Sequence, residues 1–302
     1  MSRFYPKRWL IPKSIDEALT IMGEHSAEVL LFAGGTQVHE LRERDALEWV
    51  RTVVDLRGLG LNTIENTPEA IRIGAMTTLN DLIACESFRT GGFQALVQAA
   101  YAMGPEQVKN AATVGGAVAC GIPIIDIVPA LVSLGAKVAV RSARETREVE
   151  LWSLVSGPEM FQLGKSVMIT DFILPRPAPG SRSQFKKFRR SASDWAIVNA
   201  SASIRLDGAG RCLDARLVVG SRPDGYFSLT RSEQFLIGKR IDGEALAALP
   251  GIVSPELALA DHFTAKADYK KVLAGVLIRD AGAGAAGMDM QARDAEGVDL
   301  HG

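Results

Sequence analysis

The sequence contains few of the residues that build metal centres and disulfide frameworks. Its 302 residues include three cysteines and four histidines. Cys85, Cys120 and Cys212 lie far apart and form no CxxC pair, which argues against a disulfide framework and against a cysteine-rich metal cluster. The histidines show neither HxH nor HExxH spacing, so the sequence offers no local zinc or iron site. We expect three small buried thiols and no metal.

An excess of charge of one sign and long apolar runs are also absent. With 34 basic and 35 acidic side chains the formal net charge is −1, whereas binding to nucleic acid needs a basic excess. No run of about 18 apolar residues occurs, and the first residues, MSRFYPKRWLIP, lack the long apolar stretch of a signal peptide. We expect a soluble, cytoplasmic protein that binds neither nucleic acid nor a membrane.

The composition is that of an ordinary globular protein, with 47% hydrophobic and 23% charged residues. A chain of this length usually forms about two domains. The proline-rich segment 175–181, PRPAPGS, marks the best boundary and separates a first domain, residues 1–177, from a second, residues 182–282. Residues 283–302 show no apolar stripe and are predicted to form a mobile tail.

Strand and helix patterns alternate along the first domain. A serine cap at Ser14 predicts a helix that runs to about Gly23. Further helices are predicted over 39–49, 93–108 and 130–134, and strands over 29–32, 52–56, 70–75, 136–140 and 167–174. In the second domain, a hairpin pattern over 196–206 and 212–219 precedes helical patterns over 243–248 and 271–280. This mixture predicts an α+β fold.

Two glycine pairs, Gly34-Gly35 and Gly115-Gly116, each have a threonine nearby and are the most informative feature of the sequence. A glycine pair lets the backbone approach a ligand closely and turn its N–H groups towards an anion. Neither pair belongs to a GxxxxGK[ST] loop or a GxGxxG fingerprint, so Walker-type and Rossmann sites are poorly supported. Each pair alone is more often a plain tight turn, but two in one domain suit the two phosphates of a pyrophosphate.

Asp126 and a basic segment are the other candidates for a binding site. Asp126 lies in the apolar stretch 122–129 and is either a helix cap or an acceptor for a ligand hydroxyl such as that of ribose. Segment 186–196, KKFRRSASDWA, begins with four cations in five positions. Such a cluster is most often a solvated edge, but its position just after the linker also suits a cleft between domains.

Five motifs, in their order and spacing, resemble the FAD-binding subunits of the molybdenum hydroxylases, the family of bacterial xanthine dehydrogenase and carbon monoxide dehydrogenase medium chains. The motifs are Ala33-Gly34-Gly35-Thr36-Gln37, Gln107-Val108-Lys109-Asn110, Thr113-Val114-Gly115-Gly116, Asp126 with Pro129-Ala130-Leu131, and Lys186, Arg190 and Asp194 followed by Ala196 and Val198. The similarity extends from about Phe4 to Ala281. It implies a two-subdomain FAD-binding fold of the vanillyl-alcohol oxidase-like (PCMH) type, with subdomains of about 1–57 and 58–177, followed by a small α/β C-terminal domain.

The resemblance also implies where the cofactor lies. FAD would be extended and non-covalently bound, with its pyrophosphate on the two glycine pairs. Asp126 would hold the ribitol or ribose side, Ile169 would contact the ring system through its backbone, and Trp195 would lie beside the isoalloxazine. The cofactor-binding residues carried over in this way are Leu31, Phe32, Ala33, Gly34, Gly35, Thr36, Gln37, Val38, Met103, Thr113, Val114, Gly115, Gly116, Ala117, Asp126, Ile169, Lys186, Lys187 and Trp195.

The function implied by the resemblance is that of an electron-transfer flavoprotein subunit without a catalytic residue of its own. A large subunit with a molybdenum cofactor would oxidise the substrate, and a small subunit with [2Fe–2S] clusters would relay the electrons. FAD in this chain would pass them to NAD⁺ or another acceptor. Lys186, Lys187 and Arg190 would favour anionic reduced flavin or attract a nucleotide phosphate.

Two alternatives stay open. A self-sufficient flavin oxidase of a small alcohol needs a base or a covalent flavin tether, and His39 is the one histidine near a glycine pair, although a place on a helix surface is more usual. A flavin-free assembly subunit is suggested by Ala117 and Ile122, which leave few side-chain donors beside the second glycine pair. Flavin content distinguishes these functions.

Overall fold

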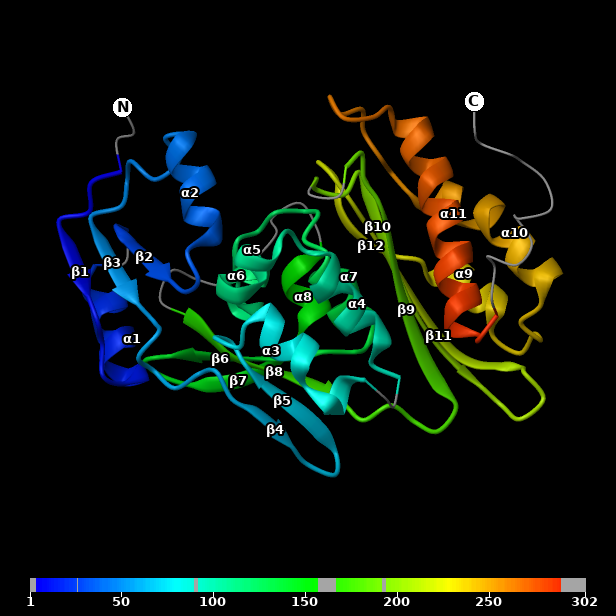
Figure 1. Cartoon of the computed structure of the whole chain (residues 1–302), viewed down its shortest axis with the longest axis horizontal. Helices are drawn as coiled ribbons and strands as arrows, with labels where there is room; N and C mark the ends of the chain where they lie inside the picture. The colour runs from blue at the N-terminus through cyan, green and yellow to red at the C-terminus, as the bar shows by residue number, and fades with distance from the viewer. Residues whose placement is uncertain (1–3, 26, 90–91, 157–166, 192–193, 289–302) are drawn as a thin grey trace.

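The chain folds into three sheets with helices between and outside them (Figure 1). The computed structural model describes residues 4–25, 27–89, 92–156, 167–191 and 194–288. Within these ranges, no helix combines the length and the apolar character needed to cross a membrane.

The first sheet is parallel and belongs to the N-terminal part of the chain. Its strands, in the order β1-β3-β2, are β1 (Arg8–Leu10), β3 (Thr52–Asp55) and β2 (Val29–Phe32). Parallel neighbours need crossover connections, and helices α1 (Ile15–Glu24) and α2 (Thr36–Glu43) supply them. The predicted start of α1 is confirmed, because the Ser14 hydroxyl accepts a hydrogen bond from the N–H of Glu17 at 3.1 Å.

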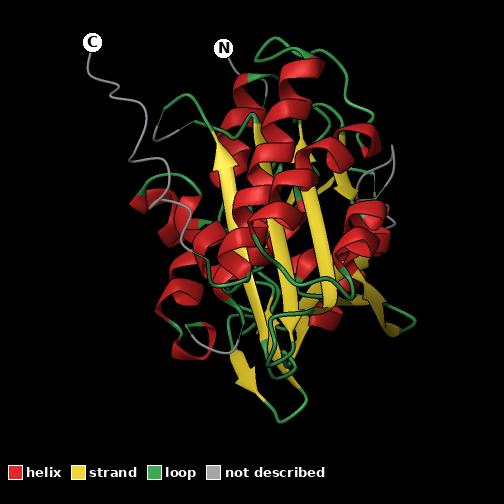
Figure 2. Ribbon diagram, turned by 90° about the vertical axis from the view of Figure 1, so that its right-hand side faces the viewer, coloured by secondary structure: helices red, strands yellow, loops and turns green. Residues whose placement is uncertain are grey.

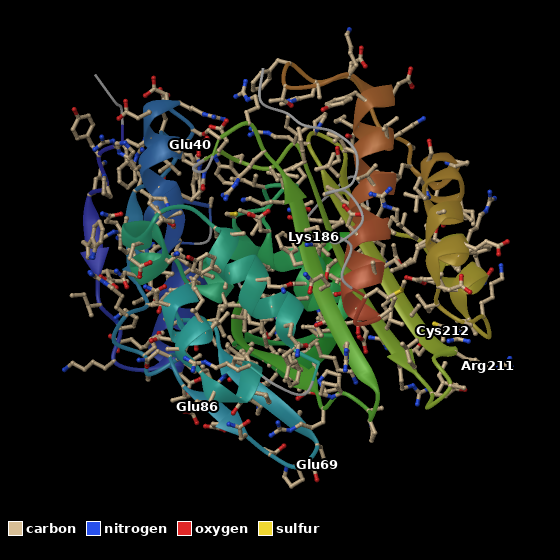
Figure 3. All side chains as sticks on the ribbon, turned by 45° about the vertical axis from the view of Figure 1, so that its right-hand side comes forward. Glu40, Glu69, Glu86, Lys186, Arg211 and Cys212 are labelled. Carbon is tan, nitrogen blue, oxygen red and sulfur yellow. The ribbon has the colours of Figure 1, made fainter. Side chains whose placement is uncertain are left out.

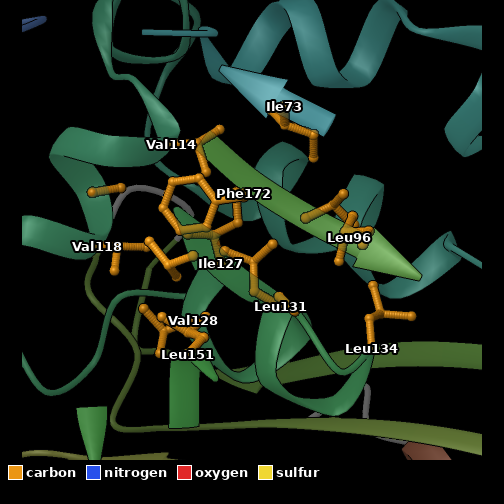
Figure 4. Close-up of a cluster of buried hydrophobic side chains, with 14 of the residues drawn as sticks. Ile73, Leu96, Val114, Val118, Ile127, Val128, Leu131, Leu134, Leu151 and Phe172 are labelled. Carbon is orange, nitrogen blue, oxygen red and sulfur yellow. The ribbon is translucent and has the colours of Figure 1, made fainter. Parts of the chain in front are cut away.

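The second sheet is antiparallel and carries a layer of helices on one face. Its order is β4-β5-β8-β6-β7, with β4 (Ile64–Asn66), β5 (Ala70–Gly74), β8 (Val167–Pro175), β6 (Lys137–Ser142) and β7 (Thr146–Glu150). The helical layer comprises α3 (Leu79–Ala84), α4 (Gln94–Ala102), α5 (Glu106–Ala111), α6 (Val114–Ala119), α7 (Ile127–Ser133) and α8 (Leu151–Val155). Phe172 and Ile73 of the sheet pack with Val114, Ile127 and Leu131 of the helices in a buried core (Figure 4).

The third sheet is antiparallel, in the order β12-β11-β10-β9, and has helices on both faces. Its strands are β9 (Ser181–Phe188), β10 (Val198–Leu206), β11 (Cys212–Ser221) and β12 (Gly225–Ser228). The remaining helices are α9 (Thr230–Leu236), α10 (Gly243–Val253) and α11 (Ala267–Ala285), and Figure 2 shows helices covering the outer face. On the inner face, α4 and α7 pack against β9 and β10. The predicted hairpin of β10 and β11 is confirmed.

Buried polar contacts fix the inner face of the third sheet against the helical layer. The hydroxyls of Ser133 (α7) and Ser201 (β10) are 2.7 Å apart, and the Ser183 hydroxyl of β9 accepts a hydrogen bond from the N–H of Ala95 at 3.0 Å. Burying a hydroxyl without a hydrogen-bond partner costs free energy. These two hydrogen bonds therefore favour the one position of the third sheet against the helical layer in which both are formed.

Two predicted helices have the wrong bounds. The helix expected over 39–49 is α2, which begins at Thr36 directly after the glycine pair and ends where Asp45 adopts a φ of 53°. The helix expected over 93–108 is two helices, α4 and α5. Gly104 with a φ of 64° and the following Pro105 interrupt it, because neither continues a right-handed helix at these positions.

Two further expectations need correction. The second glycine pair does not form a plain tight turn: Gly115 and Gly116 lie in the first turn of α6. Helix α11 continues to Ala285, past the expected end of the second domain at residue 282, because Ala281, Ala283 and Ala285 are buried against the third sheet. Residues 289–302 of the expected tail lie outside the described residues.

The cysteines are free thiols, and only one is deeply buried. Cys212 is buried, whereas Cys85 and Cys120 are half-buried, so the expectation of three buried thiols is correct for one of them. Within the described ranges, no three histidine, cysteine, aspartate or glutamate side chains gather as a metal site would require.

A buried ion pair stabilises the second domain. Lys270 of α11 is fully buried, and its ammonium donates to the Asp224 carboxylate at 2.7 Å and to the carbonyl of Arg222 at 2.9 Å. Asp224 also accepts the N–H of Ala260 at 2.7 Å. Through Asp224, the pair thus links α11, the turn before β12 and the loop that precedes α11.

Replacing Lys270 by Met should lower the free energy of unfolding by about 3–5 kcal/mol, because it leaves the Asp224 charge buried without its partner. The exposed pair of Lys266 and Asp261, at 2.9 Å, provides the control, and Lys266→Met should cost about 1 kcal/mol or less. Denaturant titration followed by circular dichroism measures both. A loss below about 1 kcal/mol in Lys270→Met would show that the buried pair is not needed.

Candidate cofactor site

A cavity of about 540 Å³ lies where the first sheet, the helical layer and β9 meet. It is lined by residues of both glycine-pair segments, by Asp126 at the start of α7, and by Lys187 of β9. Implied cofactor residues that line the cavity are Leu31, Ala33, Gly34, Gly35, Thr36, Gln37, Val38, Met103, Thr113, Gly116, Ala117, Asp126, Lys187 and Trp195. Residues that are far apart in the sequence thus come together around one cavity.

The first glycine pair opens helix α2 with free donors. Gly35 is the N-cap, with a φ of 70°, and no side chain caps this end of the helix. Within the described part of the chain, the backbone N–H groups of Gly34 to Gln37 have no hydrogen-bond acceptor. Unpaired N–H groups at a helix N-terminus form a binding site for an anion such as a phosphate.

The second glycine pair has no such donors. The N–H of Gly115 donates to the carbonyl of Ala75 at 2.8 Å, the N–H of Gly116 to the hydroxyl of Thr113 at 3.1 Å, and the N–H of Ala117 to the carbonyl of Thr113 at 2.8 Å. Because these groups are already paired, the second pair does not present an amide cradle of the kind that the sequence suggested. Its glycines serve close packing instead.

Three of these glycines pack closely against backbone or side-chain atoms, and Gly34 meets the helical layer at the end of α5. A Cβ on Gly34 would lie 1.7 Å from the carbonyl oxygen of Ala111, and a Cβ on Gly115 would lie 2.7 Å from that of Ala75. A Cβ on Gly116 would lie 2.9 Å from the Thr113 hydroxyl and 3.6 Å from the Cβ of Ala33. A side chain at Gly34 would push the first sheet away from the helical layer, whereas one at Gly115 would disturb the contact of α6 with Ala75.

Asp126 forms a buried ion pair instead of capping α7. Its carboxylate accepts the Lys187 ammonium at 2.6 Å and the Asn199 amide at 2.8 Å, and it makes no capping hydrogen bond. Both side chains of the ion pair are 8% exposed. Burial raises the pKa of Asp126, and Lys187 and Asn199 act against this by stabilising the charged form. Of the two roles that the sequence left open for Asp126, the helix cap is therefore wrong, and the basic segment 186–190 is not simply a solvated edge.

Five implied cofactor residues do not line the cavity. The ring of Phe32 lies beneath Gly35, Val114 and Gly115 are buried in the helical layer, and Ile169 is buried in β8. Lys186 lies on the opposite face of β9 from Lys187, because neighbouring strand residues alternate (Figure 3).

Sequence reasoning missed the apolar end of the cavity. Leu30, Leu41, Leu47 and Trp49 line it beside α2, and Val108, Ile124 and Ile125 line it elsewhere. The spacing of Val38 and Leu41 marks one face of α2 and could have indicated this wall. Glu40 also lines the cavity (Figure 3), but its charge is paired with Arg44 at 2.5 Å.

Two tryptophans and one cysteine also line the cavity. Trp195 and Trp49 line the cavity and are 40% and 48% exposed, so both face it from the solvent side. The Cys120 thiol donates to the carbonyl of Ala117 at 3.0 Å, and burial raises its pKa to about 11. A thiol of this kind is rarely a thiolate at neutral pH and is a poor nucleophile for a covalent tether.

Comparison with protein families identifies both parts of the chain. Residues 3–177 match the FAD binding domain in molybdopterin dehydrogenase, and residues 183–283 match the C-terminal domain of carbon monoxide dehydrogenase flavoprotein. The chain is 24% identical over 270 residues to the glyceraldehyde dehydrogenase medium chain of Sulfolobus acidocaldarius, covering 89% of this chain and 94% of the relative. It is 25% identical over 273 residues to the carbon monoxide dehydrogenase medium chain of Hydrogenophaga pseudoflava, covering 89% and 93%.

A solved structure shares the whole fold. It is carbon monoxide dehydrogenase from Hydrogenophaga pseudoflava lacking the Mo-pyranopterin moiety of the molybdenum cofactor, with a TM-score of 0.86 and 25% identity over 93% of this chain and 97% of the other. The expected two-subdomain FAD-binding fold with a small C-terminal domain is thereby confirmed. Because the first family model covers more than half of the sequence, this chain, with its FAD-binding domain, belongs to the FAD-binding subunits of the molybdopterin dehydrogenases, which are oxidoreductase subunits of the xanthine dehydrogenase family.

Proposed function

We propose that this chain is the FAD-carrying electron-transfer subunit of a multi-subunit molybdenum hydroxylase, located in the cytoplasm. The observation that carries the proposal is the cavity in which an uncapped helix N-terminus, a buried ion pair and an exposed tryptophan face the same space within an FAD-binding domain. FAD supplies the redox chemistry when bound, and the chain supplies the binding groups and their orientation.

Two residue groups have the chemistry to hold the cofactor. The free N–H groups of Gly34 to Gln37 donate to the pyrophosphate, while the second glycine pair provides space and no donors. Asp126, at the start of α7, accepts from a hydroxyl of the ribitol or ribose, and Trp195 covers the ring system at the solvent side. The apolar wall beside α2 and the protonated Cys120 fit a non-covalently bound cofactor.

Two of the four cations in the basic segment form ion pairs within the chain. Lys187 is paired with Asp126, and Arg190 with Asp194 at 3.4 Å. The attraction of these two cations for an anionic reduced flavin or for a nucleotide phosphate is reduced accordingly, and Lys187, which lines the cavity, holds the Asp126 carboxylate instead.

The partners follow from the family. We propose that a molybdopterin-binding large subunit oxidises the substrate and that a small subunit with [2Fe–2S] clusters delivers the electrons to this chain, which passes them to NAD⁺ or another acceptor. The relatives are named for different substrates, glyceraldehyde in one and carbon monoxide in another, although this chain matches both medium chains over nearly their whole length. This supports a substrate pocket outside this chain.

The alternative of a self-sufficient oxidase receives less support. His39 is exposed on α2, and among the described residues no histidine lines the cavity. A flavin-free subunit is the second alternative. It is motivated by the paired amides of the second glycine segment and by Ala117, but the first segment retains its donors.

The absorption spectrum of the purified chain tests the proposal directly. We expect flavin bands with one FAD per chain, released by heat, converted to FMN by phosphodiesterase, and reduced only through the partner subunits. A colourless chain that takes up no added FAD in the presence of its partners would favour the assembly subunit. Reduction of the isolated chain by a small alcohol would favour the oxidase.

Gly34→Ala should weaken FAD binding by roughly tenfold or more, because the added methyl group would collide with the Ala111 carbonyl and displace the donor loop. Equilibrium titration with FAD, followed by flavin fluorescence, measures the change. Gly23→Ala in α1 is the control: no atom lies within 4 Å of its Cβ position, so FAD affinity should stay at the wild-type value. Equal affinity in both variants would contradict the assignment of this loop.

Intrinsic fluorescence reports on the position of the ring. Addition of FAD to the apo chain should quench tryptophan emission, and Trp195→Phe should remove a large part of that change, because Trp195 lines the cavity. Trp152→Phe, in α8 and outside the cavity lining, should leave the quenching unchanged. The same loss of quenching in both variants would show that FAD binds elsewhere.

A further inference from the structure

The side of the cavity formed by residues 122–126 is held in place by the second domain. Neither residue that does this lines the cavity: Asn199 lies in β10 and Tyr226 in β12, and both are buried. The cavity-lining groups that they contact, Asp126 and the backbone of Ile124 and Ile125, belong to the first domain.

Asn199 holds the Asp126 carboxylate through a fixed amide. Its Nδ2 donates to Asp126 Oδ1 at 2.8 Å and to the carbonyl of Ile124 at 3.1 Å. Both partners are acceptors, which fixes the orientation of the amide. Its Oδ1 is buried, and no donor reaches it among the described residues. The amide is therefore committed to the first domain at the cost of an unpaired oxygen.

The strand beside Asn199 leaves room for this arrangement. Asn199 is paired across the sheet with Gly220, and a Cβ on Gly220 would lie 2.3 Å from Asn199 Oδ1. A glycine at this position of β11 is thus required by the amide, and not by a turn.

Tyr226 holds the adjacent backbone. Its hydroxyl accepts the N–H of Ile125 at 3.0 Å and donates to the carbonyl of Ile122 at 3.0 Å. Burial raises the pKa of this phenol well above its ordinary value, so the hydroxyl remains a donor throughout the working pH range. The segment from Ile122 to Asp126 is therefore tied at both ends to the third sheet.

We propose that Asn199 and Tyr226 are positioning residues for the cofactor: from the second domain, they fix the Asp126 carboxylate and the Ile122–Ile125 backbone, and thereby set the affinity for FAD. This inference rests on the proposed FAD function. It makes the docking of the second domain a condition for tight flavin binding. Among the described residues, Lys187 is the one residue of that domain's sheet that lines the cavity, so the other strands act only through their contacts with the first domain.

The chain offers a matched control in Ser201. This residue lies two positions after Asn199 on the same face of β10, is also fully buried, and also makes a hydrogen bond across the domains, to Ser133 at 2.7 Å. Neither serine lines the cavity. Ser201→Ala therefore removes a domain contact of the same kind without touching residues 122–126.

The experiment compares Asn199→Ala, Tyr226→Phe and Ser201→Ala in the full chain. Thermal midpoints of the apo proteins measure the loss of stability, which we expect in all three variants. Fluorescence titration measures FAD affinity, and the dissociation constant should rise roughly tenfold or more in Asn199→Ala and Tyr226→Phe but change by less than about twofold in Ser201→Ala.

A pH profile of FAD affinity separates positioning from general destabilisation. The groups that face Asp126 are Lys187 of β9, Arg189 directly after that strand and the Tyr226 phenol, with Asn199 as the neutral donor. Loss of the Asn199 amide raises the pKa of Asp126. The pH at the midpoint of the FAD-affinity profile should therefore shift upwards in Asn199→Ala and stay in place in Ser201→Ala.

If all three variants kept the FAD affinity and the pH profile of the wild-type chain, the inference would be overturned and the FAD function would stay intact. An equal loss of affinity in all three would also overturn it, because stability alone would then explain the result. A wild-type chain that takes up no FAD would overturn both the inference and the proposed function.

Discussion

The close contact between the backbone at Gly34 and the carbonyl of Ala111 is the constraint on which the site depends. At this point the parallel first sheet meets the helical layer with no space for a Cβ, so glycine is required and the loop can turn directly into α2. The turn leaves the first N–H groups of α2, in residues that line the cavity, without an acceptor among the described residues. Under the proposed function, packing and anion binding are two results of one backbone contact.

The buried pair of Asp126 and Lys187 is the complementary constraint on the other side of the cavity. Two charges with 8% exposure cost much free energy to bury, and a distance of 2.6 Å with further bonds to Asn199 and to the carbonyl of Ala102 offsets this cost. Each charge comes from a different domain, so neither is satisfied unless the domains are docked. The pair thus favours one arrangement of the third sheet.

The fold was predictable where local signals agree with the packing. The serine cap of α1 and the hairpin of β10 and β11 could be predicted because short-range bonds determine them. The break at Gly104-Pro105 was missed because the apolar pattern continues through it. In the site, the glycine pairs were visible, but the function of the second pair was not: its amides are paired to Ala75 and Thr113 through contacts that depend on tertiary structure.

Asp126 shows why the site could be predicted only in part. The sequence places it before a helix, and a cap is the ordinary role for a carboxylate at that position. Its actual partners, Lys187 and Asn199, are 61 and 73 residues away. Those partners belong to the second domain and determine the charge and the orientation of the Asp126 carboxylate. Its role therefore depends on how the two domains pack, which the residues next to it in the sequence do not show. Under the proposed function, flavin affinity is then a property of the domain arrangement as much as of the glycine loop.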